Sequence, residues 1–459
     1  MTWPAATRAV RGGQRSLLQH LARLNSMPRS RRIVGALVVA ATVSCVLLVL
    51  IDFVAAPLTG HFTGRFDDFE PILAAGRAAN VGADPYGGFL AHAPTSLVTN
   101  LGFDYMPLIA VLARPLALVP YQLAQTIWLW CILVATITAS IVVARASLPE
   151  SWPRTAVGFC VAVLFAPALY NIWHGQMNAF VLLSLAMAFR AWLRGDQVGC
   201  GLALGLGGIA KVAPAALLLL LLRRRWWRGF LAGAGTLAGS LLLGGLLLGF
   251  ERVREWLTGV LPVLSRADGW YFNESLGALL SRIANHNVFR LDAPNPALQL
   301  VITTASLACL VAAVLAVRGG EAGRDRRSLE FGAAVTAMVL AGSIAWWDDY
   351  GNLVIPLLVV VGLAARGRLA RPSIAAGAGL ALVAGVGAPL FLALGGLTWA
   401  PGTHGTPWWP AALQLDSLPA YAALLLLVTL LWSLARPPST AGGQTPVPQI
   451  GTPAQWVPR

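Results

Sequence analysis

The segment GRFDDFEPIL brings three carboxylates together, at Asp67, Asp68 and Glu70, in a chain with only 19 acidic residues among 459. One carboxylate is enough to cap the helix that the following residues predict. A second can serve as a general base, which typically contributes about 10²–10⁴ in rate. We interpret Asp68, with Asp67 beside it, as the candidate catalytic acids. The alternative is that one of the three caps the helix and the other two are solvated loop acids.

Other polar residues stand out because apolar residues surround them. His174, Gln176 and Asn178 follow two aromatic residues and could hydrogen-bond a polar ligand; the alternative is an ordinary polar turn. Lys211 lies inside an apolar run, where a central lysine costs roughly 2.5–3.5 kcal/mol on insertion scales. Ionisable groups in such runs are functional candidates. We therefore assign Lys211 to phosphate binding, with snorkelling or a structural ion pair as the alternative.

Arg282 and His286 are further candidate partners for a phosphate. The sequence has no clear metal-ligand spacing, so we expect neither a metal nor a bound cofactor. It also lacks GxxxxGK[ST], and GxGxxG after a strand, the glycine-rich motifs that bind nucleotides. The energy for a reaction must therefore arrive by another route, such as an activated group carried by a lipid.

The composition indicates a membrane protein. The chain is 57% hydrophobic and 11% charged, whereas soluble domains average about 25% charged residues. Residues 33–51, 228–250 and 373–397 are close to or beyond the roughly 20 residues that cross a bilayer as a helix. The net charge of +14 comes from arginines near the ends of apolar runs, as the positive-inside rule requires. We therefore expect an all-α polytopic membrane protein that contacts lipid and no nucleic acid.

Placing every basic cluster on the inner side predicts about ten full transmembrane helices. These spans are 33–56, 122–144, 155–170, 176–192, 228–250, 297–317, 329–346, 351–365, 373–397 and 418–435. Two further runs, 106–120 and 198–222, are interrupted by proline or glycine and predict broken or re-entrant elements. If both crossed fully, there would be twelve spans.

This threading divides the chain into a basic cytoplasmic N-terminus (1–32), a membrane domain (33–435) and a disordered, proline-rich cytoplasmic tail (436–459). Its long outer segments are a first outer loop at 58–105, predicted to be catalytic, and a second at 251–296. In the first loop Phe69, Ile72, Leu73 and Gly76 share one helical face. We expect this amphipathic helix to lie in the membrane interface with that face toward the lipid.

Six short motifs in this order resemble glycosyltransferase family 87, whose members are membrane enzymes of the GT-C fold that use polyprenyl-phosphate sugars. The resemblance covers roughly residues 50–360. It rests on Asp68-Phe69 with Gly82–Tyr86, Phe103-x-Tyr105-x-Pro107, Gly175-Gln176-Met177-Asn178, Gly205 to Lys211 with Pro214, Asn273-x-Ser275-Leu276 with Arg282, and Trp346, Tyr350 and Pro356.

The resemblance implies an inverting transferase in the plasma membrane with its active site on the outer face. Its donor would be a polyprenyl-monophosphate sugar, with mannose favoured and arabinofuranose as the alternative, and its acceptor an envelope glycolipid or glycan. It extends the candidate substrate-binding set, beyond those named above, to Asp84, Tyr86, Tyr105, Asn273, Ser275 and Tyr350.

The chain departs from the family pattern where Asp348 and Asp349 stand in place of an expected histidine. Because a carboxylate repels a phosphate, we expect these two to hold a basic side chain or to bind acceptor hydroxyls. The opposing functional class is a solute transporter or lipid flippase, which also uses broken helices and polar cavities. Transporters often contain repeated halves, and we find no clear internal repeat in this sequence.

Overall fold

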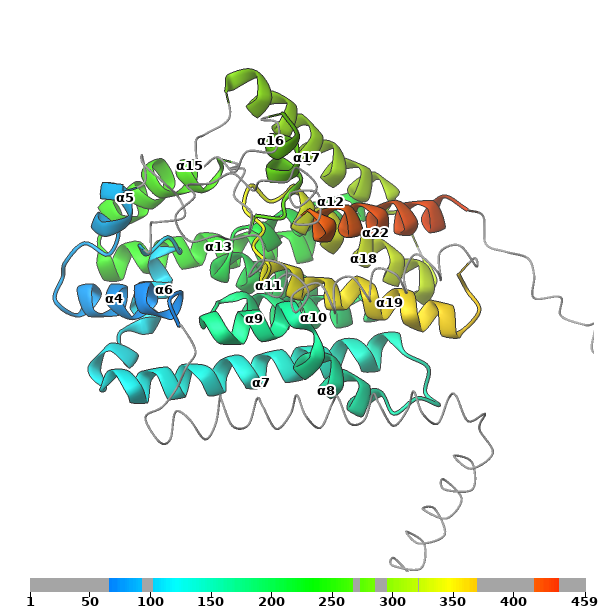
Figure 1. Cartoon of the computed structure of the whole chain (residues 1–459), viewed down its shortest axis with the longest axis horizontal. Coiled ribbons are helices and arrows are strands. Elements are labelled where there is room, and N and C mark those ends of the chain that lie inside the picture. Colours follow the sequence, from blue (N-terminus) through cyan, green and yellow to red (C-terminus); the bar gives the residue numbers. More distant parts are fainter. Residues whose placement is uncertain are drawn as a thin grey trace, which may run out of the picture.

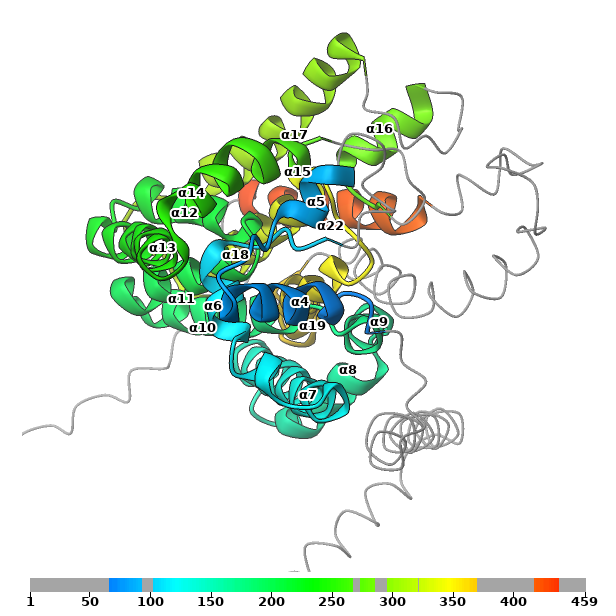
Figure 2. The same cartoon turned by 90° about the vertical axis from the view of Figure 1, so that its left-hand side faces the viewer.

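The computed structural model describes residues 66–92, 102–266, 273–284, 295–320, 322–369 and 417–436. Within these ranges all regular elements are helices and no strand occurs. Several long helices run roughly side by side across the molecule, while α4, α5, α6 and α15 gather at one end of it (Figures 1 and 2). The predicted N-terminus, the spans 33–56 and 373–397, and the tail from 437 lie outside the described residues.

Four described helices are long and apolar enough to cross a membrane. They are α7 (Tyr121–Ser147), α13 (Trp227–Leu248), α17 (Pro296–Ala316) and α22 (Leu418–Ala435). The predicted span 155–170 is instead bent by 59° between α8 (Arg154–Leu164) and α9 (Ala166–His174). A proline in the first turn of α9 has no N–H to continue α8. Counting the bent pair as one span gives up to five candidates, so the predicted ten are not confirmed.

Both runs that were predicted to be broken are broken. The first consists of α6 (Pro107–Ala113) and the 3₁₀ turn η2 (Leu116–Leu118). The second consists of α11 (Gln197–Ala210), η3 (Ala213–Leu217) and α12 (Leu218–Arg223). Lys211 lies at the second break with an extended backbone (φ −147°, ψ 140°), which takes its side chain out of the surface of α11.

Helix α10 (Asn178–Arg194) packs against α7, α11, α18 and η5, and the remaining helices complete the described part of the bundle. They are α5 (Gly87–His92), α14 (Phe250–Glu255), the π-helical turn η4 (Trp256–Val260), α15 (Leu261–Leu264), α16 (Leu276–Ala284), α18 (Arg324–Ala341), η5 (Asp349–Leu353) and α19 (Val354–Ala365). Helices α11 and α13 approach through glycine, because a Cβ on Gly201 would lie 1.8 Å from the Gly229 oxygen.

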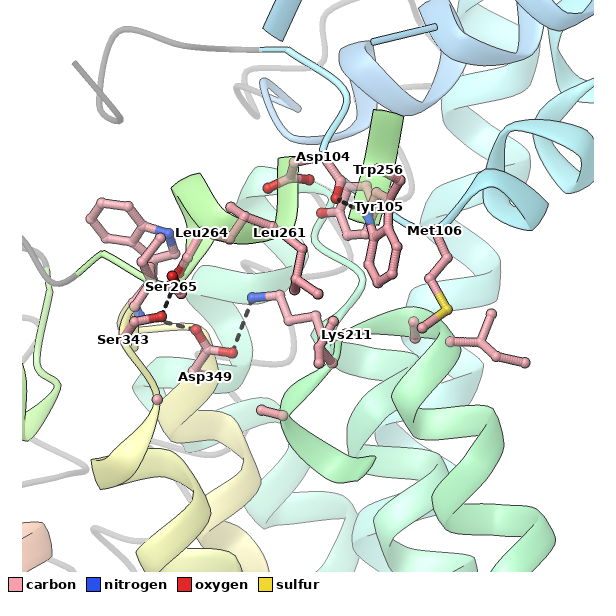
Figure 3. Close-up of a pocket in the computed structure, with 17 residues that line it drawn as sticks. Asp104, Tyr105, Met106, Lys211, Trp256, Leu261, Leu264, Ser265, Ser343 and Asp349 are labelled. Carbon is pink, nitrogen blue, oxygen red and sulfur yellow. Dashed lines mark hydrogen bonds and ion pairs between the residues drawn. The ribbon is translucent and has the colours of Figure 1, made fainter. Parts of the chain in front are cut away.

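Arginines gather where α7, α10, α12 and α19 end and α18 begins. Arg366 Nη1 donates to the main-chain carbonyl oxygen of Ser147 at the end of α7 (2.7 Å). Arg224 Nη1 lies 3.1 Å from Oε2 of the buried Glu330 on α18. The opposite ends of α10, α11, α18 and α19 meet around Lys211 (Figure 3) and hold the candidate site.

Helix α4 (Phe69–Asn80) does form in the first outer loop, but its apolar face does not lie toward lipid. Phe69 is fully buried and its ring stacks on Trp128 at 5.2 Å. Gly76 packs so closely on α6 that a Cβ there would lie 2.6 Å from the Ala113 oxygen. The predicted contact of this face with lipid was therefore wrong, because the face is covered by α6, η2 and α7.

Candidate active site

The segment that carries Asp67 and Asp68 is docked on the end of α9. The N–H groups of Phe66 and Asp68 donate to the oxygens of Trp173 and His174, each at 3.2 Å. Gly175 ends α9 with φ +71°, a conformation that favours glycine. A Cβ at Gly175 would also lie 2.9 Å from the Phe66 ring. The docking therefore depends on glycine at this position.

This docking brings the predicted acids onto the predicted histidine. His174 Nδ1 lies 2.5 Å from Asp67 Oδ1 and 3.9 Å from Asp68 Oδ2. Asp68 is the N-cap residue of α4, but its side chain makes no capping hydrogen bond. Its carboxylate, one third exposed (33%), is therefore not used by the helix.

The surroundings of Asp68 suit a proton acceptor. Burial, with the Asp348 carboxylate beside it, raises the pKa of the Asp68 carboxyl to about 7, although His174 opposes the rise. A general base works best when its pKa lies near the operating pH. Asp68 therefore has the protonation behaviour that the predicted role requires.

A second cluster forms around Lys211. Its ammonium lies 3.0 Å from Asp349 Oδ1 and 3.6 Å from Asp348 Oδ2. The Trp346 N–H donates to Asp349 Oδ2 (3.0 Å), and Asn178 Nδ2 donates to Asp348 Oδ2. Of the two roles expected for these carboxylates, holding a basic side chain is the one the structure shows.

Tyr105 and Gln176 lie between the two clusters. Tyr105 Oη donates to Gln176 Oε1 at 3.4 Å, and Asp68 and Asp348 both act electrostatically on the Tyr105 hydroxyl. Burial raises the pKa of Tyr105 well above its usual value, so the hydroxyl stays protonated. The two clusters therefore belong to one electrostatic site.

A cavity of about 320 Å³ opens beside Lys211 (Figure 3). Its walls are largely apolar and include the indoles of Trp256 and Trp346. Its charged lining residues are Asp104, Lys211 and Asp349. A pocket with apolar walls and a few convergent polar groups is the usual form of a small-molecule site.

The family model of glycosyltransferase family 87 matches residues 103–343, which is more than half of the chain. The chain belongs to glycosyltransferase family 87. It is also 28% identical over 340 residues to a Mycobacterium tuberculosis (strain ATCC 25618 / H37Rv) protein named polyprenol-phosphate-mannose-dependent alpha-(1-2)-phosphatidylinositol mannoside mannosyltransferase. That similarity covers 69% of this chain and 74% of the relative.

Within this family 87 chain, Asn273, Ser275, Arg282 and Tyr350 form a buried latch. Asn273 Oδ1 accepts from the N–H of Ala345 (3.0 Å). Arg282 Nη1 donates to the main-chain carbonyl oxygen of Asn273 (2.7 Å), and Arg282 Nη2 lies 3.5 Å from Glu274 Oε2.

Two hydroxyls complete the latch. Ser275 Oγ donates to the main-chain carbonyl oxygen of Ser343 (3.2 Å), and Tyr350 Oη donates to the main-chain carbonyl oxygen of Glu274 (2.8 Å). These four residues fix the wall at 343–350 and are not among the residues that line the cavity in the described part of the chain. Their side chains bond to main-chain groups within and beside the latch, and a direct contact with substrate stays a prediction for these four residues.

Asp84 and Tyr86 also position a neighbour. Asp84 Oδ1 accepts from the Tyr86 N–H (2.8 Å) and lies 3.2 Å from Arg252 Nη1. Tyr86 Oη donates to the Tyr105 oxygen at 2.8 Å. His286, the remaining predicted residue, lies outside the described residues.

Sequence reasoning missed Asp104, Trp256 and the wall role of Trp346. Asp104 occupies the variable second position of Phe103-x-Tyr105, which gave no reason to select it. The sequence also gave no sign that Asp67, Asp68 and His174 place atoms that could bind a metal ion within 4.8 Å of one another. The reason is that 107 residues separate Asp67 from His174. The 2.5 Å contact between Asp67 and His174 is a hydrogen-bond distance.

Proposed function

We propose that this family 87 protein transfers mannose from a polyprenyl-monophosphate carrier to a glycolipid or glycan of the cell envelope, with inversion. The name of its relative supports the donor and the glycolipid class of the acceptor. The observation that carries the proposal is the Asp68 carboxylate, which does not cap α4 and lies 3.9 Å from His174 in one electrostatic site with the Lys211 ammonium.

In the proposed reaction, the acceptor oxygen attacks the anomeric carbon of the sugar. The new carbon–oxygen bond forms as the bond between that carbon and the phosphate oxygen breaks. The acceptor proton passes to the Asp68 carboxylate, and the polyprenyl phosphate leaves on the opposite side with its electron pair. Negative charge grows on the phosphate, so a nearby cation stabilises the transition state more than the ground state.

Lys211 is the cation we assign to that phosphate. Its ammonium has three N–H donors and lines the cavity. One donor is directed to Asp349 at 3.0 Å, which leaves the others available for phosphate oxygens. The carboxylates therefore orient the ammonium rather than prevent its use.

We further propose a GT-C-type arrangement of about ten spans in the plasma membrane, with the arginine-rich end inside and the cavity outside. No metal or cofactor is needed in this mechanism, because a phosphate is already a good leaving group. An arabinofuranosyl donor is the alternative within the class, and a transporter or flippase is the alternative outside it.

The deciding experiment incubates the purified protein, reconstituted in vesicles, with polyprenyl-phosphate mannose or, in parallel, polyprenyl-phosphate arabinofuranose. A panel of envelope glycolipids serves as acceptors, and mass spectrometry identifies the products. We expect a glycolipid heavier by one hexose, with the wild type and not with Asp68→Asn. Transfer only from the arabinofuranosyl donor would change the sugar. Movement of lipid across vesicles without any product would support the flippase alternative.

A further inference from the structure

Hydrogen bonds to the main chain of Asp104 and Tyr105 hold Asp104 in place. The Trp256 indole Nε1 donates to the main-chain carbonyl oxygen of Asp104 at 3.0 Å. Tyr86 Oη donates to the next carbonyl oxygen, that of Tyr105, at 2.8 Å. Two side chains from separate elements therefore fix this short stretch, and the position of the Asp104 carboxylate follows from it.

That carboxylate lines the cavity beside Lys211 (Figure 3). Among the described residues, no side chain is found to donate a hydrogen bond to it, whereas Asp349 accepts from both Lys211 and the Trp346 N–H. Burial raises the pKa of the Asp104 carboxyl to about 6, and the Lys211 charge and a hydrogen bond from its own backbone N–H oppose this rise. At neutral pH it is therefore largely an ionised acceptor that faces the cavity.

The groups around Asp104 have the chemistry of a carbohydrate site. The indoles of Trp256 and Trp346 line the same cavity, and aromatic faces pack against the apolar C–H faces of sugar rings. A carboxylate accepts hydrogen bonds from hydroxyl groups, and such charge-assisted bonds are stronger than neutral ones. The cavity of about 320 Å³ lies at the small end of the roughly 300–1,000 Å³ range of ligand pockets.

We propose that Asp104 binds hydroxyl groups of the donor sugar and so helps to select it, in the cavity whose phosphate cation is Lys211. This inference rests on the proposed function, because it takes the glycosyl phosphate to be the occupant. The donor is favoured over the acceptor because Lys211 and Asp104 line one cavity, and in the donor the phosphate and sugar are joined by one bond.

Binding rather than turnover tests this assignment. Calorimetry on detergent-purified protein would compare a short-chain prenyl-phosphate mannose with the same prenyl phosphate lacking the sugar. Asp104→Asn should weaken binding of the mannosylated ligand by roughly 10-fold or more, the size of one hydrogen bond to a charged group. Binding of the sugar-free ligand should not change. Lys211→Met should weaken binding of both.

The matched control is Asp196→Asn, which makes the same change at an exposed position. Asp196 caps α11 through the Gly199 N–H at 2.9 Å, and asparagine caps equally well. This variant should bind both ligands as the wild type does.

The other outcomes overturn the proposal. Equal weakening of both ligands by Asp104→Asn would mean a structural role, and tighter binding of both would mean simple repulsion of phosphate. Methyl mannoside is titrated as an acceptor mimic; if Asp104→Asn weakened its binding and left both prenyl phosphates unchanged, the subsite would belong to the acceptor. If Asp104→Asn does not fold, wild-type protein is titrated with donors lacking single hydroxyls; at least one must bind roughly 10-fold more weakly. None of these measurements needs transfer, so the subsite can stand if the proposed reaction fails.

Discussion

The ammonium of Lys211 lies 3.0 Å from the carboxylate of Asp349, 138 residues away along the chain. The pair joins the break that follows α11 to the start of η5. Asp348 lies 3.6 Å from the same ammonium and is itself 2% exposed. One lysine therefore compensates two carboxylates, and this arrangement decides what its replacement would do.

Lys211→Met should lower both thermal stability and donor affinity. Removing one partner of a buried ion pair leaves the other charge uncompensated, which is strongly destabilising. Adding Asp349→Asn should restore part of the melting temperature and none of the donor affinity. Thermal melts and donor titrations of the single and double variants check this. Normal donor binding by a stable double variant would remove Lys211 from the phosphate site.

Asp68→Asn should lower turnover by roughly 10²-fold or more, because it keeps the shape and removes the basicity. Asp67→Asn should cost less, since Asp67 acts through its hydrogen bond to His174. Single-turnover rates at saturating donor separate the chemical step from binding. If Asp67→Asn abolished transfer and Asp68→Asn retained it, the two roles would have to be exchanged.

The pH profile should report Asp68 directly. The carboxylate must be ionised to accept a proton, so kcat/KM should rise with pH through about 7 and level off above it. His174→Gln removes the group that lowers the pKa of Asp68, and so should move the rising limb to higher pH. A limb that does not move would show that His174 has no electrostatic role.

Chelation should leave transfer unchanged. The close contact between His174 and Asp67 uses the nitrogen that a cation at Asp67, Asp68 and His174 would need. Activity is measured after exhaustive treatment with EDTA, with Mg²⁺ and Mn²⁺ added back in parallel. Loss of activity that either ion restores would assign a cation to this group.

Arg282→Met should destabilise the fold by about 3–5 kcal/mol, as expected when one partner of a buried pair is removed. Arg282 and Glu274 have side chains exposed by only 1% and 0%. Arg154→Gln is the control, because its partner Glu150 is exposed and such pairs contribute about 0–1 kcal/mol. Chemical denaturation in detergent compares the two. A stable Arg282→Met variant with weakened donor binding would return Arg282 to the phosphate site.

Apolar runs bounded by basic residues predict helix positions well. Residues 228–250 and 297–317 were predicted as spans, and the helices run from Trp227 to Leu248 and from Pro296 to Ala316. The breaks near Pro115 and Lys211 were also predicted, because proline and glycine interrupt helical hydrogen bonding locally. These features depend on neighbours along the chain.

Contacts between distant segments could not be predicted in the same way. An amphipathic face such as that of α4 indicates an apolar partner but does not distinguish lipid from α6. Arg282 violated the positive-inside trend and was interpreted as a phosphate ligand, whereas its charge is directed to buried Glu274. Asp104 differs from other loop acids only by its position on the cavity wall.

The docking of the acid segment on α9 also matters for protein engineering. Because the Phe66 ring lies against Gly175 and Asp67 is hydrogen-bonded to His174, an exchanged segment must keep side chains that match the other one. A chimaera that takes its first outer loop from another family 87 enzyme would need that enzyme's α9 end as well. Selection for a new acceptor would therefore act on two distant stretches of the gene as one inherited unit.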